Sequence, residues 1–360
     1  MNKTSNFENV LLEKILEKNI QVMHVCAGNR FGGIEKMVLA FAQNPNGDNQ
    51  LIHNFSVCHP GRLLKEIEKC SVNSLLFGPA RQINPFGIYF AKKKLAAFVK
   101  KLEPVVALCH GDWIFDLFGR TLARAGAKVI RVLHNIHAKK NWIFGKNSNP
   151  SYCFGVIANS LVTRENYLAN NTLADVQVAN PPFYLRNINN RQEERERLRQ
   201  SLGIGLQTKV ILTAARFEHG KGLDILINAL SIVDQGADWV CLFAGSPNGG
   251  QEEKYLSKLK ALAYQKLQKG KLIWLGHIDD LSGYYVSADL YCQPNRKPES
   301  YGLTFAEASE MGCPVVTAAI GGACEVLAGN PGNTLLQDIS KQNLANEIAR
   351  RFSFSLNKGK

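Results

Sequence analysis

Two glutamates stand eight residues apart in the stretch 294–325, which reads PNRKPESYGLTFAEASEMGCPVVTAAIGGACE. If a helix begins near Tyr301 or Gly302, its free backbone N–H groups and the positive end of its dipole lie right after Glu299, where a phosphate could bind. Glu307 then lies about one and a half turns into that helix and can reach a second part of the same ligand. Two carboxylates that flank a set of amide donors suit a ligand with hydroxyls and phosphates, such as a nucleotide sugar.

Two cations, Arg216 and Lys221, lie on either side of the loop 217–220, after an apolar segment that begins at Val210. At the carboxyl end of a strand, such a pair beside a glycine can clamp a diphosphate, Arg through paired donors and Lys as a point charge. A loop Arg and a loop Lys are also common as solvated surface charges. The residue types alone leave both interpretations open.

The elements that must position these residues alternate between apolar strands and helical patterns. The chain reads as a buried strand over Ile20–Ala27, a glycine-containing break at 28–33 and a helix over Ile34–Ala42. Strands that alternate with helices predict a parallel, doubly wound α/β sheet, which binds ligands at the carboxyl ends of its strands. Further strands are predicted at Asn54–Cys58, Ser74–Phe77, Val105–Cys109, Val129–Leu133 and Val156–Asn159, the last of which should complete the first domain.

A second series of the same kind begins at Val210, with strand patterns in ILTAARF, WVCLFAG, KLIWLGHI and LYCQPN. Between the two series, Asn180–Phe183 reads NPPF, an extended joint that a helix cannot cross, and a highly charged run follows it. We therefore predict two domains, residues 1–180 and 181–360, which is a typical division for a chain of 360 residues.

Three histidines fall on strands of the first domain. His110 and His134 each follow a predicted strand directly, so both are expected at the ligand edge of the sheet. A histidine in that place is as often structural as functional. His24 lies in the middle of its strand and is expected to be a hydrogen-bonded core residue.

The order of features around the two glutamates is similar to the donor-binding segment of retaining glycosyltransferases of family 4. The hallmark of that segment is Glu-x7-Glu, and here a short buried strand at 313–316 and a second glycine turn at 321–322 follow it. The run Ala215–Asp224 also resembles the family's diphosphate clamp, A-R-F-x-x-x-K-G-x-D, residue by residue. The resemblance covers nearly the whole chain and implies the GT-B fold, with two Rossmann-like parallel-sheet domains that face each other across a cleft.

The resemblance implies a catalytic set of Glu299, His134, Arg216 and Lys221. Glu299 and His134 would fix the donor sugar, and His134 is favoured over His110 because it matches the family's histidine. The two cations would neutralise the charge that grows on the departing nucleoside diphosphate.

Other matching residues would complete the donor site, with the acceptor on the first domain. Backbone amides of the first glycine loop would approach the donor phosphate and the acceptor, one carboxylate would hold the ribose, and backbone groups would hold the base. In that order these residues are Gly32 and Gly33, Glu307, and Gly245 and Ile278. Amides at the start of the predicted helix would add donors to the diphosphate: Tyr301, Gly302, Leu303 and Thr304.

The reaction that the resemblance implies is a hexosyl-type transfer with retention at the anomeric carbon. The donor would be a nucleotide-diphosphate sugar and the acceptor a glycan or a lipid-linked molecule, in the synthesis of cell-surface polysaccharide, lipopolysaccharide or glycolipid. No D-x-D motif occurs for a metal that bridges the phosphates. Because the cations can replace the metal, we expect metal-independent transfer without a cofactor.

Two other functions share parts of this pattern. A GT-B sugar-nucleotide epimerase would use the same clamp without an acceptor, although the Glu-x7-Glu setting speaks against it. A catalytically inactive nucleotide-sugar-binding protein would keep the same residues. Nucleic acid is not an expected partner, because the chain shows no RNA- or DNA-binding module.

The formal charge of +13 is unevenly distributed. Residues 1–180 hold 22 Lys and Arg against 12 Asp and Glu, a net charge of +10. The stretch Phe90–Leu102 (FAKKKLAAFVKKL) is a predicted helix whose apolar set includes Phe90, Leu95 and Val99, with five lysines largely on the other side. That helix either covers the sheet as a solvated element or contacts an anionic membrane surface.

The expected compartment is the cytoplasm, with peripheral binding to the inner face of the cell membrane. No run of about 18 apolar residues occurs, and the charged N-terminus resembles no signal peptide. Most of the nine cysteines lie in apolar contexts, and there is no C-x-x-C pair, as expected for reduced buried thiols. Family members commonly end in a long helix that crosses back to the first domain. Here Lys360 follows soon after the helical stretch Asn343–Arg351, so we expect that crossing helix to be short or missing.

Overall fold

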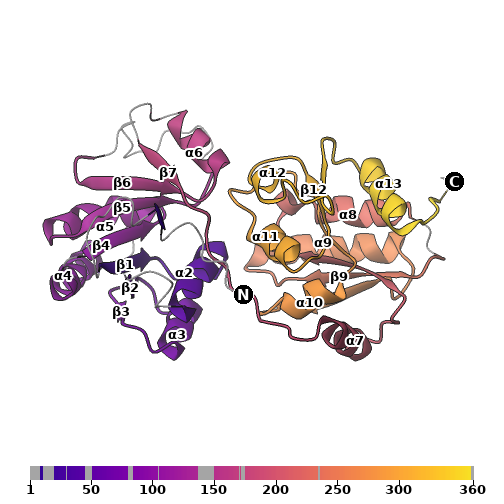
Figure 1. The fold of residues 1–360 in the computed structure, drawn as a ribbon, viewed down its shortest axis with the longest axis horizontal. Coiled ribbons are helices and arrows are strands. Elements are labelled where there is room, and N and C mark those ends of the chain that lie inside the picture. Colours follow the sequence, from indigo (N-terminus) through magenta and orange to yellow (C-terminus); the bar gives the residue numbers. More distant parts are fainter. Residues whose placement is uncertain are drawn as a thin grey trace. The chain divides into compact units, whose positions relative to one another are not determined.

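The structure is a computed structural model that describes residues 9–10, 20–29, 31–44, 51–79, 84–103, 105–136, 150–169, 171, 175–233 and 236–357. The chain divides into two compact units that meet in the sequence between Tyr184 and Leu185, close to the predicted boundary after Asn180 (Figure 1). We call them the N-unit and the C-unit.

The N-unit is built on a seven-stranded parallel sheet with the order β3-β2-β1-β4-β5-β6-β7. Its strands are β1 (Gln21–Cys26), β2 (Ile52–Val57), β3 (Ser74–Leu76), β4 (Val105–His110), β5 (Lys128–Leu133), β6 (Cys153–Ala158) and β7 (Val176–Val178). Its helices are α2 (Gly33–Gln43), α3 (Arg62–Lys69), α4 (Pro85–Leu102), α5 (Asp112–Arg124) and α6 (Leu161–Leu168).

Alternate residues of the inner strand β1 enter two different hydrophobic cores. Val22 and Cys26 pack with α2 and α3, whereas Met23 and Val25 pack with α4 and α5 on the opposite face (Figure 1). Because side chains alternate along a strand, a β1 that is apolar at nearly every position fits only between two layers of helices. The predicted doubly wound sheet is confirmed.

The C-unit repeats this plan with a six-stranded parallel sheet of the order β10-β9-β8-β11-β12-β13. Its strands are β8 (Lys209–Ala214), β9 (Trp239–Ala244), β10 (Leu272–Gly276), β11 (Leu290–Gln293), β12 (Val315–Ala318) and β13 (Thr334–Leu336). Its helices are α7 (Arg191–Ser201), the short 3-10 helix η1 (His219–Lys221), α8 (Leu223–Leu230), α9 (Gly250–Lys266), α10 (Ser282–Ser287), α11 (Leu303–Glu310), α12 (Ala323–Val326) and α13 (Lys341–Phe352).

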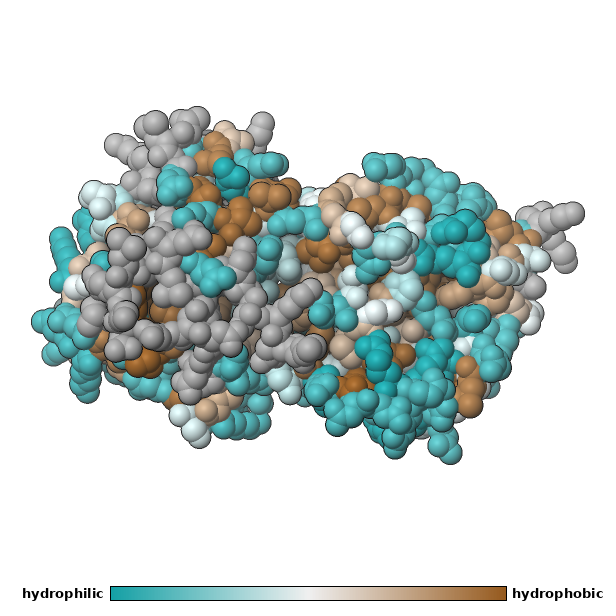
Figure 2. All heavy atoms as spheres, viewed as in Figure 1, coloured by the Kyte–Doolittle hydropathy of each residue, from teal (hydrophilic) through white to brown (hydrophobic). Residues whose placement is uncertain are grey.

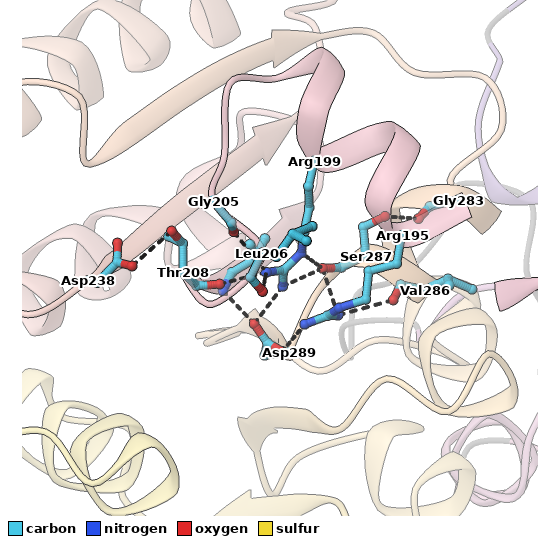
Figure 3. A network of polar contacts seen from close by, with 11 residues as sticks. Arg195, Arg199, Gly205, Leu206, Thr208, Asp238, Gly283, Val286, Ser287 and Asp289 are labelled. Carbon is cyan, nitrogen blue, oxygen red and sulfur yellow. Dashed lines mark hydrogen bonds and ion pairs between the residues drawn. The ribbon is translucent and has the colours of Figure 1, made fainter. Parts of the chain in front are cut away.

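The charged run that follows the joint forms α7 and belongs to the C-unit. Its outer face is hydrophilic (Figure 2), but Arg199 is buried. Arg195 and Arg199 point from the helix to Asp289, at 2.5 and 2.9 Å, and Arg199 also donates to the backbone carbonyl of Ser287 (Figure 3). Asp289 in turn accepts the N–H of Val210 at 2.7 Å, so one carboxylate joins the helix to the sheet.

Two expectations for the N-unit were wrong. β6 does not complete the sheet, because β7 pairs in parallel with it. In α4, Leu95 and Val99 are buried as predicted, but Phe90 is exposed. The buried stripe runs through Ala91, Leu95 and Val99 at intervals of four, and Phe90 lies about 100° around the helix from Ala91. Within the described residues, no helix is both long and apolar enough to span a membrane.

Candidate functional site

Two loops at the carboxyl edge of the C-unit sheet are in direct backbone contact. The loop after β8 ends at Gly222, which has a φ of +67° and whose Cα hydrogen faces the Pro294 carbonyl: a Cβ there would lie 1.9 Å from that oxygen. The carbonyl of Gly220 accepts the N–H of Arg296 at 2.9 Å. Only glycine permits this approach, which brings Lys221 to the loop that carries Glu299.

Glu299 forms an ion pair with Lys221 at the centre of this site. The same carboxylate oxygen accepts a hydrogen bond from the Asn295 amide at 3.1 Å and lies 3.4 Å from the Gln293 amide nitrogen. Gln293 donates to Asn295 at 2.8 Å and lies 3.0 Å from the hydroxyl of Tyr291. Since these three neighbours are fully buried, the Glu299 carboxylate is held in one orientation.

The glycine turn after β12 holds the backbone of the same loop. Gly321 pairs with Glu299 in a parallel bridge, and the N–H of Gly322 donates to the Glu299 carbonyl at 2.8 Å. A Cβ on Gly321, which has a φ of +64°, would lie 2.5 Å from that carbonyl oxygen. The predicted second glycine turn therefore supports the first glutamate.

The helix that follows, α11, begins at Leu303 with Gly302 as its N-cap, close to the predicted start. The backbone N–H groups of Leu303 and Thr304 have no acceptor within the helix, so they are available at its N-terminus. The hydroxyl of Tyr291, on the strand before this loop, donates to the carbonyl of Ala214 at 3.0 Å. Burial, with a smaller effect from Glu325, raises the pKa of Tyr301 to about 12, so this residue is a neutral phenol.

Glu307 is buried one turn into α11, and its carboxylate accepts a hydrogen bond from Tyr285 at 2.8 Å. Burial and the neighbouring carboxylate raise the pKa of Tyr285, which is therefore a permanent donor. Glu307 starts the second turn of the helix rather than lying one and a half turns in. Its carboxylate is oriented by Tyr285 of α10, which the sequence analysis missed.

Arg216, Gly245 and Ile278 follow the neighbouring strands β8, β9 and β10, at the same edge of the sheet. Arg216 is half exposed and forms an ion pair with Glu218. The N–H of Gly245 donates to the carbonyl of Gly276 at 2.7 Å. The two predicted clamp cations thus each have a carboxylate partner. A bound diphosphate would have to displace Glu218 and Glu299 from these cations or bind to the cations beside them.

The predicted N-unit residues lie at the carboxyl ends of its strands. Gly32 is the N-cap of α2, where its N–H donates to the Glu35 carboxylate at 3.0 Å, and Gly33 is the first residue of the helix. This hydrogen bond, one half of a capping box, uses the Gly32 amide that was expected at the donor phosphate. Glu35 was not identified as its partner, although a Glu three residues after an N-cap is the usual sign of it.

His134 follows β5 and is the last member of a hydrogen-bonded row. We call His53, His24, His110 and His134, which contact one another in that order, the histidine row. His24 is a hydrogen-bonded core residue, as predicted. His53 was not identified, and the row as a whole depends on strand register, which the sequence does not state. Among the described residues, no group of His, Cys, Asp or Glu side chains is arranged to hold a metal ion.

Part of the chain is similar to known glycosyltransferases. Residues 194–353 match the family model "Glycosyl transferases group 1". A D-inositol 3-phosphate glycosyltransferase of Xylanimonas cellulosilytica is 32% identical over 146 residues, 39% of this chain and 33% of the relative. The lipopolysaccharide core biosynthesis mannosyltransferase LpsB of Rhizobium meliloti is 25% identical over 161 residues, 44% of this chain and 42% of the relative. The chain thus spans about a third to two fifths of the length of these relatives.

The fold itself is shared over almost the full length. Anabaena HepE, solved in complex with UDP and glucose, superposes with a TM-score of 0.73 at 19% identity, covering 92% of this chain and 89% of HepE. Likeness at this level of identity shows the fold. The predicted fold class, GT-B with two doubly wound parallel-sheet domains, is confirmed, and residues 194–353 resemble group 1 glycosyl transferases.

Proposed function

We propose that the protein is a retaining, metal-independent glycosyltransferase of family 4 that takes a hexosyl-type sugar from a nucleotide-diphosphate donor. The observation that carries this proposal is the pairing of Lys221 with Glu299 at the N-terminus of α11. A cation, an oriented carboxylate and free helix amides lie within one site, and the Arg216 loop follows the adjoining strand. Such a site suits a diphosphate joined to a sugar.

In this proposal the bound diphosphate displaces Glu299 from Lys221 and Glu218 from Arg216. Both cations then pair with the diphosphate, and the N–H groups of Leu303 and Thr304 donate further hydrogen bonds to it. Glu299 is then released from its cation and can accept hydrogen bonds from the sugar hydroxyls. These fixed donors stabilise the charge on the departing nucleoside diphosphate without reorganisation.

Glu307 holds the ribose of the donor. Tyr285 occupies one of its carboxylate oxygens at 2.8 Å, which fixes the direction of the other. Gly245 and Ile278, at the ends of β9 and β10, hold the base through backbone groups. The relative LpsB is a mannosyltransferase of lipopolysaccharide core biosynthesis, which supports an acceptor that is a glycan or a lipid-linked molecule.

We propose that the acceptor is met at an anionic membrane surface. Three aromatic side chains at the start of α4 face solvent: Phe86 is 78% exposed, Tyr89 63% and Phe90 59%. Four exposed lysines follow them on the same helix: Lys93, Lys94, Lys100 and Lys101. Exposed aromatics beside lysines favour the interface of an anionic leaflet, where each lysine near the surface contributes about 1 kcal/mol. The protein would then work on the cytoplasmic face of the cell membrane.

Calorimetric titration with UDP, GDP and ADP tests the donor site first. One of them should bind to the wild-type chain and bind clearly less to Lys221→Ala. The corresponding nucleotide sugars are then incubated with lipid-linked and soluble glycan acceptors, and the anomeric configuration of the product is determined. Binding without transfer to any acceptor would indicate an inactive binding protein, and release of a free sugar without acceptor would indicate an epimerase.

Flotation with liposomes tests the membrane contact. The chain should rise with vesicles of phosphatidylglycerol at low salt, less so at high salt, and less so when Phe86 and Phe90 are replaced by Ser. Replacement of Tyr264, which is 90% exposed on α9 of the C-unit, serves as the matched control. If the wild-type chain stays at the bottom with every vesicle, the acceptor is met in solution.

A further inference from the structure

The histidine row runs diagonally across one face of the N-unit sheet. It crosses β2, β1, β4 and the end of β5, which are consecutive neighbours in the sheet. At each step the next histidine lies two residues beyond the residue that pairs with the previous one: His53 pairs with Val22, His24 with Leu108 and His110 with Val132. Because residues i and i+2 of a strand share a face, the four rings follow one line to the carboxyl edge.

Every link of the row joins the same two kinds of nitrogen. Nδ1 of His53 lies 2.8 Å from Nε2 of His24, Nδ1 of His24 lies 3.0 Å from Nε2 of His110, and Nδ1 of His110 lies 3.0 Å from Nε2 of His134. Each inner ring therefore uses both of its nitrogens. His134 is left with Nδ1 outside the row.

The rings are buried, and His24, His110 and His134 are neutral. None of the four is more than 7% exposed, and Phe41 of α2 packs on His24 with ring centroids 4.7 Å apart. Burial lowers the pKa of His24 and His110 well below the ordinary value, and it lowers that of His134 to about 4 in spite of Asp112. A neutral imidazole carries one N–H and one lone pair, so each ring donates at one nitrogen and accepts at the other.

Because the rings are linked through Nδ1 and Nε2 and each neutral ring has one N–H, only two protonation patterns place one hydrogen bond in every link of the row. If every ring is protonated at Nδ1, each link has one proton and Nδ1 of His134 is a donor. If every ring is protonated at Nε2, each link again has one proton and Nδ1 of His134 is an acceptor. A ring in the opposite tautomer would put two protons, or none, in at least one link, which leaves buried polar atoms unsatisfied.

We propose that His53, His24 and His110 are positioning residues for His134, and that the shared tautomer of the histidine row decides whether Nδ1 of His134 donates to its ligand or accepts from it. The ligand is the sugar of the donor, an assignment that rests on the proposed function. A sugar hydroxyl can either donate or accept a hydrogen bond, so the tautomer of the histidine row determines in which orientation a hydroxyl binds to His134. The tautomer is already fixed in the protein without ligand.

NMR of the full chain tests the row without any ligand. With 15N-labelled histidine, long-range proton–nitrogen correlations report the tautomer of each ring, and single His→Asn variants assign the signals. The four rings should show one common tautomer, with nitrogen–nitrogen coupling across the three links. Two different tautomers within the row, or a charged ring in it at pH 7, would overturn the proposal.

A pair of substitutions at the far end of the row tests the coupling. His53→Leu leaves Nε2 of His24 without its partner, and a buried lone pair is tolerated better than a buried N–H. The three remaining rings should therefore all be protonated at Nδ1, including His134. His53→Asn, whose amide can donate or accept, should keep the wild-type tautomer. Phe41→Leu removes packing at His24 and His53 without touching a link, and should also leave the tautomers unchanged. Any other tautomer at His134 in His53→Leu contradicts the coupling.

Kinetics test the effect on the donor sugar. His110→Leu should lower kcat about 10- to 100-fold, the loss seen when a histidine that binds a metal loses its outer hydrogen-bond partner, whereas His110→Asn should recover part of the loss. Affinity for the bare nucleoside diphosphate should be unchanged in both. Equal losses in both variants would reject positioning. If the wild-type chain transfers no sugar at all, the proposed function fails, while the NMR results still decide the row.

Discussion

The two units bury polar side chains in different ways. The N-unit places four imidazoles in a line, and each of the two inner rings uses one nitrogen towards each of its neighbours. The C-unit buries charge: Arg195 and Arg199 share Asp289, and Lys221 pairs with Glu299. The first arrangement depends on the direction of each hydrogen bond, whereas the second depends on the pairing of opposite charges.

Within the C-unit, some ion pairs stabilise the fold, whereas one ion pair could be displaced by a ligand. Arg199 makes hydrogen bonds to carbonyls of Ser287, Leu206 and Thr208 besides Asp289, so no group from outside could replace all of its partners. Lys221 has its ion pair at the end of a short 3-10 helix, with its side chain 17% exposed. Substitutions can therefore test which property matters in each region: the charge of a side chain, the direction of its hydrogen bonds, or whether a ligand can displace its partner.

The largest expected effect is that of Asp289→Asn on the stability of the C-unit. The change keeps the shape of the side chain but leaves two guanidinium groups, one of them fully buried, without a counter-charge. Loss of one partner of a buried ion pair costs about 3 to 5 kcal/mol. Urea unfolding followed by the fluorescence of Trp239 and Trp274 should show this loss in the free energy of unfolding.

Arg197→Met is the matched control on the same helix. Arg197 is 62% exposed and pairs with Glu194, so its loss should change the free energy of unfolding by about 1 kcal/mol or less. Equal effects of the two substitutions would mean that the Asp289 network is no more than a surface feature.

The second prediction concerns acid. The pKa of His134 is about 4 in the folded chain and 6.5 in the unfolded one, so between pH 6.5 and 4 the unfolded chain binds a proton that the folded chain does not. The stabilisation is complete above pH 6.5 and decreases as the pH falls, by about 3 kcal/mol at pH 4 for this ring alone. His24 and His110, whose pKa values are also lowered, add to the loss.

The C-unit should resist the same change. Burial opposes ionisation of Glu347, but hydrogen bonds from Arg350, Thr334 and Arg351 outweigh it and bring its pKa to about 2. The stability that this carboxylate supplies is present above pH 4.5 and is lost only as the pH falls towards 2. Hydrogen exchange at pH 7 and pH 5, corrected for intrinsic rates, should show β1 and β4 losing protection while β8 and β11 keep theirs. Parallel loss in both units would contradict the comparison.

Much of this organisation could be predicted from the sequence because its signals are local. Continuous apolar runs gave the strands, and glycines next to cations placed the loops after β8 and before α11. Helix α7 was missed, because a run with seven charged residues among eleven shows no apolar stripe. The residue that binds its Arg195 and Arg199 is Asp289, which lies nearly a hundred residues away in the sequence. The histidine row was missed for a related reason: it needs the register of four strands, which hydrophobic patterns do not specify.

The third prediction separates the two clamp cations. Lys221→Ala should weaken binding of the nucleoside diphosphate by about 1.5 to 3 kcal/mol, the usual contribution of a hydrogen bond to a charged group. Arg216→Ala should weaken it within the same range but towards its lower end, because Arg216 is half exposed and paired with Glu218 at the surface. Calorimetric titration measures both, with thermal unfolding as the check that the fold is kept. Unchanged affinity in both variants would remove the clamp from the proposed function.

The smallest expected effect on affinity belongs to Glu299→Gln, and it has the opposite sign. In the free protein the Glu299 carboxylate competes with a diphosphate for Lys221, and loss of a partly exposed pair is worth about 0.5 to 1 kcal/mol. The variant should therefore bind the nucleoside diphosphate about two- to fivefold more tightly. The Gln side chain still accepts from Asn295, so the loop should keep its shape.

Turnover of the full nucleotide sugar should fall in Glu299→Gln, because in the proposed function this carboxylate contacts the sugar. Glu307→Gln is the matched substitution on the same helix: it keeps an acceptor for Tyr285 but loses a carboxylate that we place at the ribose, so it should weaken binding even of the bare nucleoside diphosphate. Titration of both variants with the nucleoside diphosphate and with its sugar decides the matter. If Glu299→Gln weakens nucleotide binding as much as Glu307→Gln does, then Lys221 and Glu299 bind the ligand as an intact pair, and the exchange of partners that distinguishes the C-unit from the histidine row does not take place.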